Sequence, residues 1–148
     1  MKKAIYLIPM VFLGGCNFFD SELVVACEET LKKRLRSPSS YERIELTSRS
    51  TELNTRDEVK AKLIAHGHDG ALLEAQLRDF DSGTAKPTEF SLLIEYDAPN
   101  AYGTMLRDVS KCEYFSMSGR VDRASWFNVK VDGQTDIEWF TERLKKIR

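Results

Sequence analysis

The chain has 148 residues, of which 42% are hydrophobic and 30% are charged, and its formal net charge is −1. This hydrophobic fraction is too high, and this net charge too low, for a disordered chain. The sequence has no basic excess to neutralise phosphates, which argues against a nucleic-acid partner. A domain of about 150 residues buries roughly 70% of its unfolded surface, so we expect a folded core without extra covalent links.

The first fifteen residues have the order of an export signal. Lys2 and Lys3 give a positively charged start, an apolar run from Ala4 to Leu13 follows, and two glycines end the segment. The apolar run is about half as long as the roughly twenty residues that a membrane-spanning helix needs. We therefore expect residues 1–15 to be a signal peptide rather than a permanent membrane span.

The end of this segment, Leu13-Gly14-Gly15-Cys16, resembles the lipobox of bacterial lipoproteins. The resemblance implies cleavage before Cys16 and lipid attached to that cysteine, so that the membrane is a partner of the protein. It also implies a periplasmic location, and Asn17 after the lipid site favours the outer membrane over the inner one in a Gram-negative host. The other interpretation is an ordinary buried strand that carries a cysteine by chance.

Cleavage would leave a mature chain of 133 residues with a net charge of −3. Residues 16–19 would then form a short lipidated tether of about 10–14 Å, ahead of a single domain at residues 20–148. We expect this domain to lie close to the bilayer.

The remaining cysteines, Cys27 and Cys112, form an even number in an exported chain. An oxidising compartment favours a disulfide between them, which would join the first helix to the sheet. Two buried free thiols are the main alternative, and a catalytic cysteine is a weaker one because no histidine is near either residue in the sequence.

The sequence of residues 20–148 predicts an α+β fold. We expect N- and C-terminal helices around a small antiparallel sheet of three to four strands, with a helical insertion between the first two strands. Apolar residues recur at helical spacing in 20–35, from Thr55 to Gly67, in 71–80 and from Asp136 onward. We expect Asp20 and Asp136 to cap the first and last of these helices, and Thr55 and Glu58 to form a capping box at the start of the second. Strand patterns occupy 41–48, 90–96, 109–117 and 126–131, and Pro99 is expected inside a turn.

The order of several of these segments resembles a module of uncharacterised exported bacterial proteins. The resemblance rests on Ser37-Pro38-Ser39-Ser40 after a cysteine-bearing helix, on the segment from Tyr96 to Gly103, and on Cys112. It spans residues 27–115, and the helical insertion at 55–80 departs from it. It supports the disulfide and implies no known activity.

Few side chains have a pattern that indicates chemistry. His66 and His68 invite a metal site, but glycines on both sides make this segment an inter-helix turn that would need a third ligand from elsewhere. We expect no metal, no cofactor and no catalytic residue that the sequence can name. The candidates for contact with a protein partner are two tryptophans, Trp126 and Trp139, and two residues of a turn, Asn100 and Tyr102. The alternative for the tryptophans is partial burial under a loop, and the alternative for the turn residues is an ordinary tight hairpin.

These observations favour a lipid-anchored periplasmic protein that binds or assists another component of the cell envelope without catalysis. The alternative is a small envelope hydrolase that acts on cell-wall or lipid material with dispersed polar residues. A pocket with convergent carboxylates or histidines would favour the enzyme.

Overall fold

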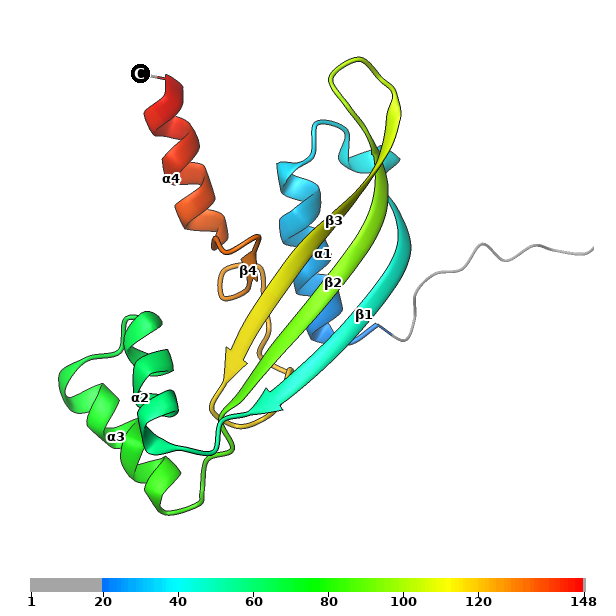
Figure 1. The fold of residues 1–148 in the computed structure, drawn as a ribbon. Coiled ribbons are helices and arrows are strands. Elements are labelled where there is room, and N and C mark those ends of the chain that lie inside the picture. Colours follow the sequence, from blue (N-terminus) through cyan, green and yellow to red (C-terminus); the bar gives the residue numbers. More distant parts are fainter. Residues whose placement is uncertain (1–19, 148) are drawn as a thin grey trace, which may run out of the picture.

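The computed structural model describes residues 20–147, so the predicted signal peptide, Cys16 and the tether lie outside the described residues. A four-stranded antiparallel sheet has the order β1-β2-β3-β4, and helix α1 packs on one of its faces (Figure 1). The sheet consists of β1 (Glu42–Glu52), β2 (Thr88–Pro99), β3 (Met105–Ser116) and β4 (Lys130–Val131). The helices are α1 (Glu22–Arg34), the short 3-10 helix η1 (Pro38–Ser40), α2 (Arg56–Ala65), α3 (Gly70–Asp81) and α4 (Asp136–Ile147). The α+β prediction, including the helical insertion, is therefore confirmed.

The main core lies between α1 and the sheet. Leu92, Ile94 and Tyr96 alternate along β2 and are buried on the face that α1 covers, while Leu93 between them is 46% exposed on the opposite face. This period of two is what a strand with one buried face requires. The sheet therefore has one packed face and one open face.

The predicted disulfide between Cys27 on α1 and Cys112 on β3 is present, and both cysteines are buried in the main core. Cys112 lies opposite Leu92 of β2 and Val131 of β4, so the bond ties the first helix to the middle of the sheet. The helix itself begins after Ser21, whose hydroxyl accepts from the backbone N–H of Val24, and not after Asp20 as the sequence predicts.

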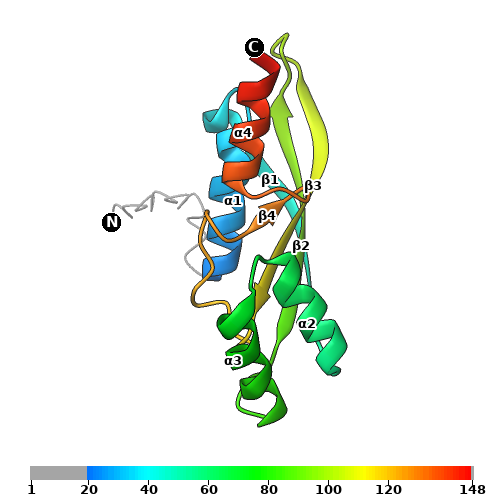
Figure 2. The same ribbon diagram turned by 90° about the vertical axis from the view of Figure 1, so that its left-hand side faces the viewer.

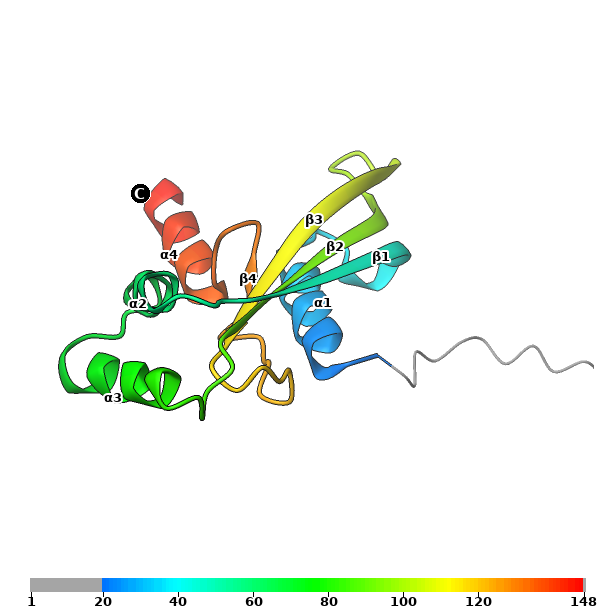
Figure 3. The same cartoon turned by 60° about the horizontal axis from the view of Figure 1, so that its bottom comes forward.

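The insertion α2–α3 has a core of its own, formed by four buried residues, Val59, Leu63, Leu73 and Leu77. The two helices lie side by side at the end of the sheet where β1 ends and β2 begins (Figures 1 and 3). Thr55 and Glu58 form the predicted capping box at the start of α2. Phe115 and Met117, at the end of β3, pack on this second core and so connect it with the sheet.

Two expectations about the later strands are wrong. Pro99 is the last residue of β2 rather than a turn residue; the turn follows it, and the Asn100 side chain closes the turn by accepting from the N–H groups of Tyr102 and Thr104. The predicted strand at 126–131 is reduced to β4, because the Asn128 side chain bonds to the backbone of Ser125 and folds residues 125–129 into a turn.

The C-terminal helix α4 is present as predicted, but its cap is Thr135, whose hydroxyl accepts from the N–H of Glu138, rather than Asp136. Ile137, Phe140 and Leu144 are exposed, so the apolar stripe of this helix is not part of either core. Figure 2 shows α4 toward the opposite end of the domain from the α2–α3 insertion. In residues 20–147 no helix combines the length and the apolar composition that crossing a membrane requires.

Candidate ligand-binding cleft

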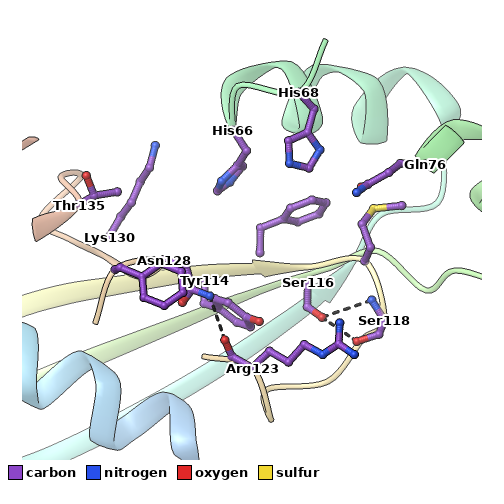
Figure 4. A pocket seen from close by; sticks show the side chains of 13 residues that line it. His66, His68, Gln76, Tyr114, Ser116, Ser118, Arg123, Asn128, Lys130 and Thr135 are labelled. Atoms are coloured by element: carbon purple, nitrogen blue, oxygen red, sulfur yellow. Dashed lines mark hydrogen bonds between the residues drawn. The ribbon is translucent and has the colours of Figure 1, made fainter. Parts of the chain in front are cut away.

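A cleft of about 480 Å³ lies between the helical insertion and the body of the domain (Figure 4). Three stretches of chain that are far apart in the sequence meet there: the α2–α3 junction, the end of β3, and the loop around β4. The cleft is lined by His66, His68, Gln76, Tyr114, Phe115, Ser116, Met117, Ser118, Arg123, Phe127, Asn128, Lys130 and Thr135.

The position of the cleft follows from the unequal lengths of β3 and β4. The pairing of β4 with β3 ends at Cys112 and Glu113, whereas β3 continues to Ser116. Beyond Glu113 the outer edge of β3 therefore has no strand partner among residues 20–147. Such an edge presents backbone donors and acceptors, and the residues at this one line the cleft.

An aromatic contact fixes one histidine at the insertion side of the cleft. The ring of His66 stacks on Phe115, with ring centroids 5.3 Å apart. Burial lowers the pKa of His66 below its usual value, and the positive charges of Lys130, Lys62 and His68 lower it further, while Glu89 opposes them. Burial and the neighbouring basic residues therefore favour the neutral form of His66.

Two polar atoms on the insertion side are buried without a hydrogen-bond partner among the described residues. They are Nδ1 of His68 and Oε1 of Gln76. An unsatisfied buried polar atom costs free energy of about 1–3 kcal/mol. Both side chains line the cleft, but the two atoms are themselves buried, so a ligand would reach them only after the side chains shift.

The opposite side of the cleft is held in place by its own hydrogen bonds (Figure 4). The Ser116 hydroxyl accepts from the backbone N–H groups of Ser118 and Arg120, each at 3.3 Å, and lies 3.1 Å from the Ser118 hydroxyl. The Asn128 side-chain amide donates to the carbonyl of Arg123 at 2.9 Å. These bonds order the loop that carries Arg123 before any ligand enters.

The polar groups that line the cleft are imidazoles, hydroxyls, amides and two cations. The lining contains two histidines but no carboxylate. Within residues 20–147 no three His, Cys, Asp or Glu side chains are grouped to hold a metal ion. The hydroxyls of Ser116 and Ser118 bond to each other and to backbone, and neither is hydrogen-bonded to a histidine in this part of the chain.

The residues predicted to contact a partner lie outside this cleft. Trp126 is 43% exposed beneath the ammonium group of Lys33, which lies 4.1 Å from the ring centroid. Trp139 is partly buried between Arg34 and Arg143. The two tryptophans therefore flank the last turn of α1, and their role in partner binding stays a prediction.

Asn100 and Tyr102 lie at the tip of the β2–β3 hairpin, where Tyr102 is 93% exposed. The hydrogen bonds of the Asn100 side chain account for the turn itself. They do not decide whether Tyr102 contacts a partner, so this prediction is also retained.

Sequence reasoning singled out His66 and His68, as possible metal ligands, but missed the other side of the cleft. Arg123, Phe127 and Lys130 have no shared spacing with the histidines, so no local pattern could have joined them. The one usable signal is that the glycine-bounded turn places both imidazoles at the end of a helix.

Comparison of the chain with protein families, with curated proteins and with solved structures found no match. We therefore infer the function from the residues and geometry of the chain itself.

Proposed function

We propose that this protein is a lipid-anchored accessory protein of the bacterial cell envelope, which binds a segment of another envelope protein in the cleft between the helical insertion and the sheet. The observation that carries this proposal is the cleft itself, which lies along the part of β3 that has no strand partner in the described chain. An extended segment can add to such an edge through main-chain hydrogen bonds while its side chains enter the hollow.

The anchor in this proposal is lipid on Cys16, and its support is the lipobox resemblance of Leu13-Gly14-Gly15-Cys16. Two or more acyl chains hold a protein at a membrane stably, so such an anchor requires no transmembrane helix. Asn17 supports the outer membrane, with the domain facing the periplasm. The disulfide between Cys27 and Cys112 suits the same oxidising compartment.

The anchor is tested by labelling cells with a radioactive or clickable fatty acid and recovering the protein. We expect label on the wild-type chain and none on Cys16→Ser, with Ser48→Ala, an exposed position of β1, as the control that keeps its label. Label that persists in Cys16→Ser would contradict the proposed attachment site.

Binding in the cleft is tested by photocrosslinking in intact cells. A benzoyl-phenylalanine in place of Phe127, which is 57% exposed and lines the cleft, should capture a protein that mass spectrometry identifies. Arg123→Glu should reduce this product, whereas Arg49→Glu, on the exposed part of β1, should leave it unchanged. No product at Phe127, or a product indifferent to Arg123→Glu, would contradict the proposal.

A further inference from the structure

The side chains that line the cleft carry an excess of positive charge. Its lining includes two permanent cations, Arg123 and Lys130, as well as His66 and His68, but no Asp or Glu. Within residues 20–147 neither Arg123 nor Lys130 forms an ion pair, although many other charged side chains in this part of the chain do.

We propose that the cleft recognises an anionic group attached to a planar apolar body, such as an aryl phosphate or an aromatic residue next to a carboxylate. This inference rests on the proposed function, because it names the chemistry by which the same cleft would hold its partner. The anionic group would meet Arg123 and Lys130, and the planar body would meet the aromatic lining.

The nearest carboxylates do not neutralise these cations. Glu89 and Glu113 line a smaller adjoining hollow of about 180 Å³, which Lys130 also borders. Glu89 is paired with Lys62, and Glu113 with Lys111 at 2.7 Å. Glu138, whose pKa Lys130 helps to lower, accepts hydrogen bonds from the backbone and hydroxyl of Thr135. None of these three acids forms an ion pair with Lys130, so its charge remains available to a ligand.

The apolar part of the ligand has a surface to contact. Phe127 is largely exposed and lines the cleft, and Phe115 already stacks on His66. Aromatic pairs favour offset or tilted stacking with centroids about 4.5–7 Å apart, so a flat ligand beside Phe127 would have favourable geometry. Charge fixes the orientation of the ligand, and stacking adds affinity.

Two polar groups of the lining would contribute only after a shift of their side chains. Nδ1 of His68 and Oε1 of Gln76 lack partners in the described chain but are buried, so ligand atoms, or water that the ligand holds, would reach them only if the side chains moved. Burial disfavours the protonated form of His66 in the free protein, as do Lys130, Lys62 and His68, while Glu89 favours it. A bound anion would also favour the protonated form, so binding should be accompanied by proton uptake at His66.

The test uses full-length protein, with its N-terminal segment intact, in an uncharged maltoside detergent. Phenyl phosphate is titrated while NMR follows the backbone amides of the cleft. Benzyl alcohol has a similar ring without charge, and inorganic phosphate has the charge without a ring. We expect phenyl phosphate to bind at least tenfold more tightly than either control compound, with shifts at Ser116, Ser118 and Asn128.

Arg123→Gln and Lys130→Gln should each weaken phenyl phosphate binding about tenfold, because each removes a charge-assisted contact. Lys60→Gln is the matched control, since Lys60 is an exposed cation of α2 outside the cleft. Unchanged amide spectra elsewhere would show that the variants fold. Equal binding of benzyl alcohol, or equal effects of all three substitutions, would overturn the ligand class.

The two experiments separate the anionic-ligand proposal from the proposal that the cleft binds another envelope protein. A partner captured through Phe127 in cells, together with no binding of phenyl phosphate, would overturn the anionic ligand and leave the binding role intact. Phenyl phosphate binding without any captured partner would overturn the binding of an envelope protein and leave the anionic ligand class intact.

Discussion

Cys27 of α1 is covalently joined to Cys112 of β3 across 85 residues of sequence. The loop that this bond closes contains β1, the whole helical insertion and β2, so the disulfide constrains most of the domain. It reaches the sheet next to β4, whose short pairing defines the open edge of the cleft.

Removal of this disulfide should strongly destabilise the domain. For a closed loop of about 85 residues the chain-entropy model predicts a loss of about 4–5 kcal/mol in unfolding free energy, which native-state strain would reduce. Urea unfolding of Cys27→Ser combined with Cys112→Ser, compared with the oxidised wild type, measures this loss. A loss below about 1 kcal/mol would contradict the predicted contribution.

His66 should make the stability of the domain depend on pH. Its pKa is lower in the folded chain than in the unfolded chain, so the unfolded state binds more protons once the pH falls below about 6.5. The unfolding free energy should therefore decrease as the pH falls through this range, and His66→Gln should remove that part of the slope. NMR titration of the imidazole carbon-bound protons checks the cause, and a pKa at or above the usual value would contradict it.

Arg43 should contribute more to the stability of the domain than Arg49, the other arginine of β1. Its guanidinium contacts Asp20 at 2.8 Å and Glu28 at 3.3 Å, and Glu28 also accepts a hydrogen bond from the Tyr41 hydroxyl at 2.8 Å. Arg43→Leu leaves the buried carboxylate of Glu28 with less compensation, so we expect a loss of about 1–3 kcal/mol in chemical denaturation.

The control for Arg43 is Arg49→Leu on the same strand, where the side chain is exposed. It should change the unfolding free energy by less than about 0.5 kcal/mol. Equal losses in the two variants would show that the contacts of Arg43 with Asp20 and Glu28 contribute little.

Truncation of the apolar stripe of α4 should have little effect on the stability of the monomer. Phe140 is 57% and Leu144 51% exposed, so Phe140→Ala or Leu144→Ala removes little buried apolar surface. We expect losses below about 1 kcal/mol, against about 2–5 kcal/mol for Leu77→Ala in the core of the insertion. Thermal unfolding would contradict this if the α4 variants lost as much as Leu77→Ala.

Much of the fold could be predicted because its local signals agree with its packing. The alternation from Phe90 to Tyr96 lies on a strand with one buried face, and the Thr55–Glu58 pair caps α2. The failures occurred where a side chain directs the backbone. Asn100 closes a turn that the sequence placed at Pro99, and Asn128 folds a turn where apolar residues suggested a strand.

The cleft could be predicted only in part, because it is a product of tertiary structure. His66 and His68 stood out by spacing, but the stacking of His66 on Phe115 and its proximity to Lys130 depend on how the insertion packs against the end of β3. Arg123 belongs to a loop with no regular pattern. Its place in the cleft follows from the Asn128 hydrogen bond to its carbonyl, which no sequence period encodes.

We expect a partner to bind in the cleft at Phe127 rather than at the hairpin tip at Tyr102. The most direct measurement compares photocrosslinking yields in intact cells for one benzoyl-phenylalanine placed in turn at Phe127 and Tyr102, both of which are exposed. Trp126 is not used, because its ring centroid lies 5.9 Å from that of Phe127. We expect one dominant product from Phe127, which Arg123→Glu reduces. A dominant product from Tyr102, with none from Phe127, would contradict binding in the cleft.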